Sequence, residues 1–396
     1  MTDTPPRRRR QERRDEDRSV GVLELFFDLV YVYAMSQVTT LVLQEVSWTG
    51  FGRGVLVLGA VWWAWENYAW LTNTFERADV PARILIFLAM AAMLIAATAL
   101  PAAFAEMALA FAIAYFVVRV LHVALLVRAV RGDEKLHSAA WGLTPLLLLG
   151  SGLIIVAAFL PSPYRELLWL FSGLIDFSGP LIRGLRGWRV APGYFVERHG
   201  NIVIIALGEV IVRMGEGAAT GLHRPLTALA VTVAVLIAAG MWWAYFEPVP
   251  HAVERLRRTD PVRRAHHARD AYSYLHLPLI TGSVFFAVGV HEAIAHPGEP
   301  LAPLSGVTLA GGLALFYFGE LAYRWRDHHR LMVDRLVAGA AAAAMIPIAA
   351  RVPAVATLGA LLLIGAVRVA WEIRSGIFSE RAGRPVRGRL SWTRSR

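Results

Sequence analysis

Apolar residues along this chain fall into long runs that are separated by short polar gaps. Each run is close to the roughly 20 residues that an α-helix needs to cross a bilayer. We therefore predict an all-α, polytopic transmembrane helix bundle of about 12 spans. The predicted spans cover residues 22–43, 52–72, 82–104, 107–130, 139–160, 164–185, 200–219, 225–247, 271–295, 303–324, 331–350 and 352–373.

Basic residues crowd into alternate gaps, which is the asymmetry expected when arginine and lysine are kept on the cytoplasmic side. The pattern predicts a protein of the bacterial cytoplasmic (inner) membrane with both termini in the cytoplasm. Residues 1–19 are expected to form a disordered basic tail, and residues 375–396 a second basic tail. Both tails are expected to contact anionic lipid head groups.

Composition agrees with a membrane protein. Of the 396 residues 56% are hydrophobic, which is more than a soluble globule accommodates. The net charge of +10 lies beside helix ends, so it favours anionic lipid over nucleic acid as a partner. The absence of cysteine excludes disulfides and thiolate metal sites, and no HExxH, GxSxG or phosphate-binding loop occurs. We therefore predict no metal, no cofactor and no catalytic residue, and leave the oligomeric state open.

Three short motifs recur in the same order along the chain. They pair Glu24 and Asp28 with Glu197 and Asn201, Trp62–Glu66 with Trp242–Glu247, and Tyr115–Phe116 with Tyr317–Phe318. This order predicts two six-helix membrane halves, residues 20–190 and 191–374. Because six is an even number, the two halves would have the same orientation in the bilayer, like the parallel repeats of some transporters.

Polar residues within the predicted spans are candidates for an ion or substrate path, because an unpaired charge in hydrocarbon costs on the order of 3 kcal/mol. The candidates are Glu24, Asp28, Glu66, Asn73, Arg119, Arg198, Asn201 and Glu209. Glu24 and Asp28 lie four residues apart on one helix face, so either one of them is protonated or both face a cation. Alternatively, Glu24 lies at the interface and Asp28 alone is deep.

Span seven carries Arg198, Asn201 and Glu209 on one stripe. Arg198 is expected to pair with an acid at the entrance of span one or two. Glu209 has no predicted partner on its own helix, so it should be protonated or paired across helices. Arg119 with a carboxylate would be structural, and Glu320 with Arg324 forms an i, i+4 pair.

The segments Glu24–Ala34, Glu197–Gly200 and Ile204–Glu209, with the tryptophan-rich second span and Asp79 with Arg83, resemble the bacterial low-temperature-requirement protein A (LtrA) family. The resemblance covers nearly the whole chain between the basic tails. It implies a multi-pass membrane protein connected with growth in the cold, and it implies no particular chemistry.

Three functions follow from these residues as hypotheses. The favoured one is a cation- or proton-linked transporter or channel that moves a small ion or solute by means of the intramembrane carboxylates. A membrane-embedded enzyme acting on a lipid or lipid-linked substrate would instead group Glu24, Arg198 and His199 at one interface. A non-catalytic structural or sensory role would close the polar residues into buried ion pairs.

Overall fold

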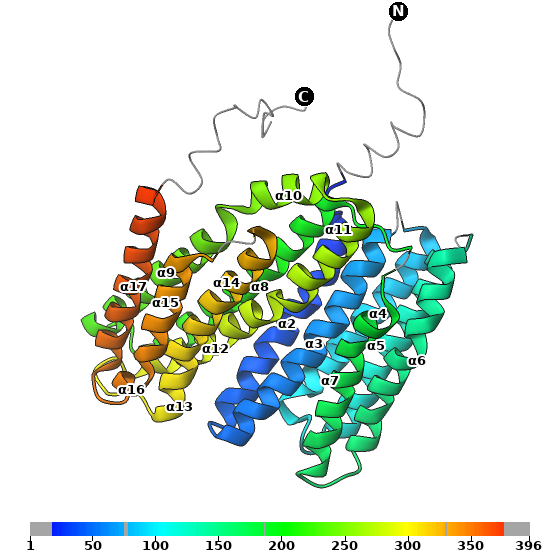
Figure 1. Cartoon of the computed structure of the whole chain (residues 1–396). Helices are drawn as coiled ribbons and strands as arrows, with labels where there is room; N and C mark the ends of the chain where they lie inside the picture. The colour runs from blue at the N-terminus through cyan, green and yellow to red at the C-terminus, as the bar shows by residue number, and fades with distance from the viewer. Residues whose placement is uncertain (1–17, 75–77, 133, 186, 329–330, 376–396) are drawn as a thin grey trace, which may run out of the picture.

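The computed structural model describes residues 18–74, 78–132, 134–185, 187–328 and 331–375. Over these residues the chain is helical, without strands, and Pro300 and Pro353 form an isolated bridge. The tails predicted at residues 1–19 and 375–396 lie almost wholly outside the described residues. The long helices are α2 (Val22–Gln44), α3 (Trp48–Thr74), α4 (Val80–Ala99), α5 (Ala108–Ala129), α6 (Glu134–Ala157), α7 (Tyr164–Arg183), α8 (Pro192–Ala218), α9 (Pro225–Phe246), α12 (His276–Ala295), α14 (Gly312–His328), α15 (Val333–Ala344) and α17 (Ala354–Ser375) (Figure 1).

Eight helical stretches within the described residues are long and apolar enough to cross a membrane. They contain α2, α4, α5, α6, α9, α12, α14 and α17. The other four predicted spans coincide with α3, α7, α8 and α15, which are either more polar or shorter. The all-helical membrane class is therefore confirmed, whereas the count of twelve spans stays a prediction.

Helix starts follow from local sequence. Pro192 and Pro225 occupy the first positions of α8 and α9, where the missing N–H costs no hydrogen bond. Asp79 caps α4, since its side chain accepts a hydrogen bond from the backbone N–H of Ala82 at 3.0 Å.

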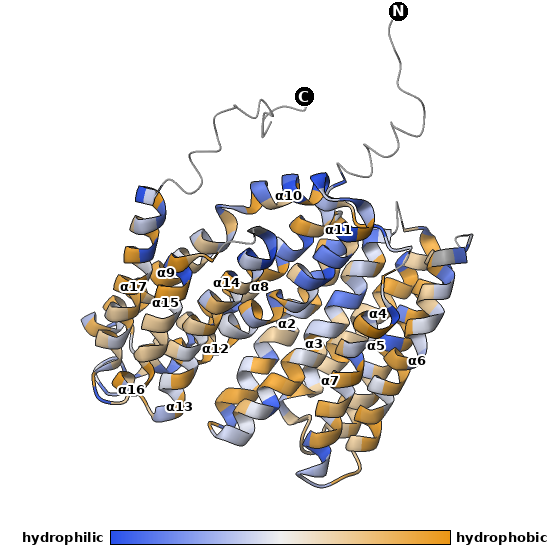
Figure 2. Ribbon diagram, viewed as in Figure 1, coloured by the Kyte–Doolittle hydropathy of each residue, from blue (hydrophilic) through white to orange (hydrophobic). Residues whose placement is uncertain are grey.

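The core of the bundle is built around α12, which packs between α8 and α14. The backbones of α12 and α14 lie very close together at Gly282. A Cβ atom placed on this glycine would lie 2.5 Å from the backbone nitrogen of Phe316. A side chain at this position would push the two helices apart, as expected where small residues allow close packing in membranes. Large apolar side chains remain exposed along the outer helices, for example Ile84, Phe87 and Leu88 of α4, where lipid would contact them (Figure 2).

One end of the bundle carries two short helices, α10 (Val249–Arg258) and α11 (Pro261–Ala268), in the segment that was predicted as a gap between spans. They lie across this end and are rich in hydrophilic residues (Figures 1 and 2). A π-helical turn, η2 (Arg269–Tyr274), joins α11 to α12. A second π-helical turn, η3 (Val307–Gly311), follows the short α13 (Pro303–Gly306), and α16 (Ile346–Ala349) follows α15.

Candidate functional site

The interior of the bundle contains carboxylates that are almost completely shielded from solvent. Among the described residues, seven are buried: Asp28, Glu66, Asp176, Glu209, Glu320, Asp334 and Glu372. Six of these pair with a guanidinium group, and Glu66 pairs with an imidazole. The partner matters because arginine stays charged in proteins, whereas histidine gains and loses a proton near neutral pH.

Asp28 of α2 pairs with Arg198 of α8, so the prediction that Arg198 meets an acid at the entrance of span one or two is confirmed. The Nη1 atom of Arg198 lies 2.5 Å from Asp28 Oδ2 and 2.9 Å from the backbone oxygen of Glu24. The indole N–H of Trp65 donates to Asp28 Oδ1 at 2.9 Å. The guanidinium also lies over the Trp65 ring, 5.6 Å from its centroid, which adds a cation–π contact.

Glu24 lies nearer the end of α2 and is partly exposed. Its carboxylate is 3.3 Å from the Arg18 guanidinium and accepts a 3.4 Å hydrogen bond from the Tyr194 hydroxyl. Glu24 thus lies near the helix end and Asp28 alone is deep, which is the alternative stated for this pair, and each of the two faces a guanidinium. A cavity of about 10 Å³ lies between Glu24 and Arg198, which is room for about one water molecule.

Glu66 of α3 lies at a crossing with α8 and the π-helical turn η2. Its Oε2 atom is 3.1 Å from Nε2 of His199. Its Oε1 atom accepts hydrogen bonds from the Trp70 indole at 2.8 Å and from the Ser273 hydroxyl. The Trp62 indole N–H donates to the backbone oxygen of Ser273 at 2.9 Å, so the same tryptophan-rich face holds the turn in place.

The hydrogen bond at the other ring nitrogen of His199 shows whether a proton lies between Glu66 and His199. Nδ1 of His199 lies 2.8 Å from the backbone oxygen of Phe195, an acceptor, so Nδ1 must carry a hydrogen. A neutral ring would then present a bare lone pair of Nε2 to a carboxylate. The 3.1 Å contact therefore needs one additional proton, held on Nε2 or on Oε2. We call this arrangement of Glu66 and His199 the shared-proton pair.

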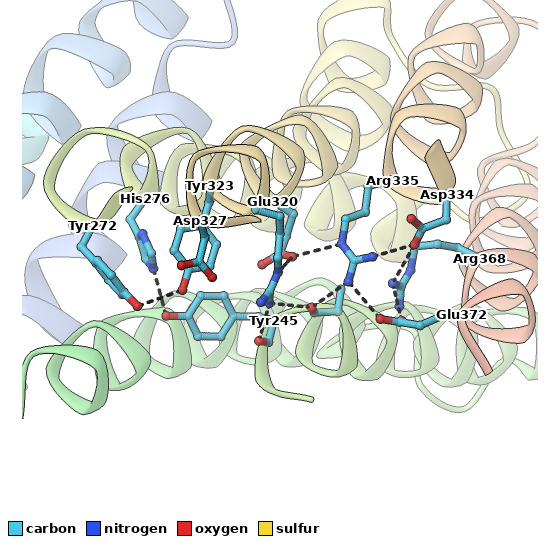
Figure 3. Close-up of polar contacts among 12 residues, drawn as sticks. Tyr245, Tyr272, His276, Glu320, Tyr323, Asp327, Asp334, Arg335, Arg368 and Glu372 are labelled. Carbon is cyan, nitrogen blue, oxygen red and sulfur yellow. Dashed lines mark hydrogen bonds and ion pairs between the residues drawn. The ribbon is translucent and has the colours of Figure 1, made fainter. Parts of the chain in front are cut away.

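Two further polar rings, those of Tyr272 and His276, lie next to the His199 ring of the shared-proton pair. The His199 ring centroid is 5.4 Å from that of His276 and 5.1 Å from that of Tyr272. His276 Nδ1 faces the backbone oxygen of Ala271, so its Nε2 atom accepts the 2.9 Å hydrogen bond from the Tyr245 hydroxyl. This contact between His276 and Tyr245 needs no additional proton (Figure 3).

Glu209 corrects one prediction, because it does have a partner on its own helix. Arg213 lies one turn further along α8 and its Nε atom is 2.6 Å from Glu209 Oε1. The same oxygen accepts a 2.5 Å hydrogen bond from Thr39 of α2. Arg213 lies within the predicted span 200–219 but is not among the candidate residues that the sequence indicates. Asp28 and Glu209 thus lie at different levels of the α2–α8 interface, each with its own arginine.

Arg119 of α5 forms a 2.6 Å ion pair with Asp176 of α7, and both side chains are buried. The pair joins α5 to α7, as expected for a structural contact. The Nε and Nη1 atoms of Arg119 have no hydrogen-bond partner, and neither has the buried hydroxyl of Tyr31.

A larger ionic network was not foreseen from the sequence. It joins α14, α15 and α17 through three acids and three arginines, namely Glu320, Arg324, Asp334, Arg335, Arg368 and Glu372 (Figure 3). Arg335 lies at its centre, 3.3 Å from Glu320, 2.7 Å from Asp334 and 3.0 Å from Glu372. The predicted pair of Glu320 with Arg324 is confirmed at 3.0 Å. The spacing of Arg368 and Glu372 in span twelve was an available signal for the rest.

The two remaining candidates are amides. Asn73 ties the end of α3 to the segment before α8, because its Nδ2 atom donates to the backbone oxygen of Arg189 at 2.6 Å and its Oδ1 atom accepts from the backbone N–H of Ala191 at 3.0 Å. Asn201 is partly exposed, and its side chain has no hydrogen-bond partner among the described residues. The amide of Asn73 therefore holds a connection in place, and Asn201 is not brought together with the other candidates.

The grouping expected for an enzyme does not form. Arg198 faces α2, whereas the neighbouring His199 faces Glu66 of α3, so Glu24 and His199 do not share one cluster. Among the described residues, no three His, Asp or Glu side chains gather into a group that would hold a metal ion.

Comparison with known proteins shows the family to which the chain belongs. The family model of the bacterial low temperature requirement A protein (LtrA) matches residues 19–370. The chain belongs to the LtrA family. It is also similar to an uncharacterized protein of Rhizobium meliloti (strain 1021), with 29% identity over 326 residues that cover 79% of this chain and 78% of the relative. No solved structure matches.

Membership of the LtrA family agrees with the resemblance of the motifs at the starts of spans one and seven, and with a membrane protein of several apolar helices. The matched residues include both the Asp28–Arg198 contact and the shared-proton pair.

Proposed function

We propose that this LtrA-family membrane protein is a proton-linked transporter, with the shared-proton pair of Glu66 and His199 as the group that binds and releases the proton. One observation carries the proposal: of the seven buried carboxylates among the described residues, Glu66 is the one that pairs with an imidazole and not with a guanidinium. In the six pairs with arginine the guanidinium does not give up a proton, so no proton can be shared between the two partners.

Loss of the proton from this pair would also force a movement. With Nδ1–H held by the backbone of Phe195, a neutral His199 ring would present its Nε2 lone pair to the Glu66 carboxylate. Two acceptors repel each other at 3.1 Å, so α3 and α8 would have to separate or the ring would have to turn. Protonation is thereby linked to the packing of these helices, which is the requirement for proton-coupled transport.

The two predicted halves gain support from the helix contacts. In residues 20–190, α2 packs on α3 and α4, α4 on α5, α5 on α6, α6 on α7, and α7 on α3. In residues 191–374, α8, α9, α12, α14, α15 and α17 contact one another in the same scheme. This agreement favours two six-helix repeats and twelve spans.

The shared-proton pair lies between the proposed halves, since Glu66 belongs to the first and His199 with Ser273 to the second. Binding sites at the interface of repeats are typical of secondary transporters. Ser273 belongs to the π-helical turn η2, and such turns are frequent at functional sites. The pair lies about 12 Å from the end of α3, as eight residues of helix separate Glu66 from Thr74.

The other candidate residues receive roles by their position. The Asp28–Arg198 contact and the Glu209–Thr39 hydrogen bond also join α2 to α8 across the proposed interface. We assign them to holding the observed arrangement of the halves, from which they must be released when the halves move. The arginine bias favours the cytoplasmic membrane, with both termini and the α10–α11 end on the cytoplasmic side.

The test is proton flux into liposomes that contain the purified protein, driven by a pH gradient and followed with an enclosed pH-sensitive dye. The wild-type protein should carry protons faster than empty vesicles, and Glu66→Gln should reduce the flux to the level of empty vesicles. Glu247→Gln is the matched control, because Glu247 ends the repeat-related helix α9 in an exposed position. It should retain the wild-type flux.

Flux equal to that of empty vesicles in the wild-type protein, or unchanged flux in Glu66→Gln, would remove the proposal. A structural or sensory role is then the second candidate. It is favoured by the number of buried carboxylates that are closed into ion pairs with arginine.

A further inference from the structure

A cavity of about 420 Å³ lies at the end of the bundle that carries α10 and α11. It is formed by these two helices, the connection between them and the end of α14. The charged side chains that line it are Arg255, Arg258, Arg263, Arg326 and Asp327. Four guanidinium groups thus face one carboxylate, which gives the lining a strong positive excess.

The ion pairs of Arg258 and Arg326 are exposed or partly exposed, so they compete weakly with a ligand. Arg258 pairs with Glu254 at 2.8 Å, but their side chains are 78% and 53% exposed, and such surface pairs contribute little. Arg326 is 3.1 Å from Asp270 in a partly exposed pair. Arg263 is exposed and forms no ion pair with another described residue.

Arg255 is held in a fixed position at the cavity by a nearly buried partner. Its Nη2 atom forms an ion pair with the nearly buried carboxylate of Asp327. Its Nε atom is buried and has no hydrogen-bond partner. Asp327 also lies 3.3 Å from Nε2 of His267, so α10, α11 and α14 are joined at the base of the cavity.

We propose that this cavity binds a phosphate monoester anion. Guanidinium groups match the oxygen geometry of phosphate through paired N–H···O bonds, and an anion would balance the excess of positive charge. The hydroxyl of Thr259 and the rings of His266 and His267 line the same space and offer further polar contacts. A volume of about 420 Å³ is in the range of small-molecule pockets, so the group that carries the phosphate also fits.

The anion has two possible sources with the same chemistry. Because α10 and α11 lie across an end of a membrane bundle, the phosphate of a lipid head group is within reach of the cavity (Figure 1). A soluble phosphate ester would enter from the aqueous side. The site is separate from the basic terminal tails, and it does not depend on the proposed proton transport.

The experiment measures binding to the full-length protein in detergent, with glycerol phosphate as the soluble probe and phosphatidic acid as the lipid probe. Calorimetry reports the first, and native mass spectrometry counts retained molecules of the second against phosphatidylcholine. The variants are Arg263→Gln and Arg258→Gln, both at exposed positions where folding should be unaffected. Arg131→Gln is the matched control, because Arg131 is exposed and does not line the cavity.

Each cavity variant should weaken binding of the preferred probe about tenfold, which corresponds to about 1.4 kcal/mol. Arg131→Gln should leave the affinity within twofold of the wild-type value. Preference for glycerol phosphate supports a soluble ligand, and preference for phosphatidic acid supports a lipid ligand. The proposal is overturned if neither probe binds, if the cavity variants bind as the wild type does, or if Arg131→Gln weakens binding as much as they do.

Discussion

Arg198 and His199 are neighbours on α8, and each faces a buried carboxylate from a different helix. Arg198 meets Asp28 of α2 at 2.5 Å, and His199 meets Glu66 of α3 at 3.1 Å. In the first contact the partner is a guanidinium, which keeps its charge at all accessible pH values. The second requires a proton that the histidine and the glutamate share, so its integrity depends on whether that proton is present.

Burial of a carboxylate does not by itself identify a proton site. Glu320, Asp334 and Glu372 are as deeply buried as Glu66, yet three arginines neutralise them in the network around Arg335. A histidine alone is also insufficient, because His276 accepts a hydrogen bond from Tyr245 and needs no further proton. A buried acid and an imidazole with an anchored Nδ1–H are both required.

The largest expected effect is on stability, in Asp28→Asn. Removal of this carboxylate leaves the Arg198 guanidinium buried without an ionic partner, and its Nε and Nη2 atoms already lack hydrogen-bond partners. We expect the free energy of unfolding to fall by about 3–5 kcal/mol. Thermal unfolding in detergent, with the wild-type protein measured alongside, reports this loss.

Glu66→Gln should have a much smaller effect on the same measurement, which sharpens the comparison. The glutamine oxygen can accept from Trp70 and Ser273, and its amide can donate to Nε2 of a neutral His199. We expect a loss of about 1 kcal/mol. Equal destabilisation by Asp28→Asn and Glu66→Gln would contradict the distinction between the two contacts.

Tyr245→Phe tests the second histidine. The substitution removes one neutral hydrogen bond to His276, so it should cost about 1 kcal/mol of unfolding free energy and leave proton flux in liposomes unchanged. Abolished flux in a folded Tyr245→Phe protein would show that His276 takes part in the proton path. The proton site would then include His276 in addition to Glu66 and His199.

The smallest effect is expected at an exposed ion pair outside the membrane-spanning core. The guanidinium of Arg128, and then the backbone N–H of Ala82, hold the pKa of Asp79 below its usual range. A lowered pKa in the folded state means that Asp79 stabilises the protein above its unfolded pKa and loses this contribution as the pH falls through the folded value. The difference in melting temperature between the wild type and Asp79→Asn should therefore be small at neutral pH and vanish in acid. A constant difference across this range would contradict it.

Much of the architecture could be predicted from the sequence, because hydrophobic run length identifies helices directly. Each of the twelve predicted stretches coincides with a helix, and the i, i+4 spacing of Glu320 and Arg324 identified their contact. Contacts between helices that are far apart in the sequence are harder to predict. Arg198 could be assigned an acidic partner from its stripe on span seven, but its neighbour His199 could not be matched to Glu66, 133 positions earlier.

Two buried arginines near helix ends were also not predicted from the sequence. Arg213 and Arg335 lie near the limits of predicted spans, where arginine is expected to face the polar gap. In the structure both are buried, because α2 covers Arg213 and because α14 and α17 enclose the first turn of α15. Hydropathy measures where a run ends, but it does not report which side chains at that end are covered by neighbouring helices.

The most direct test of the shared-proton pair is infrared difference spectroscopy of the membrane-embedded protein during a pH titration. The account predicts a reversible carboxyl signal from a buried group that disappears in Glu66→Gln. The signal should persist in Glu209→Gln, where Arg213 keeps Glu216 as a partner at 2.7 Å. A buried carboxyl signal that survives in Glu66→Gln, or that disappears in Glu209→Gln, would contradict the assignment of the proton to Glu66 and His199.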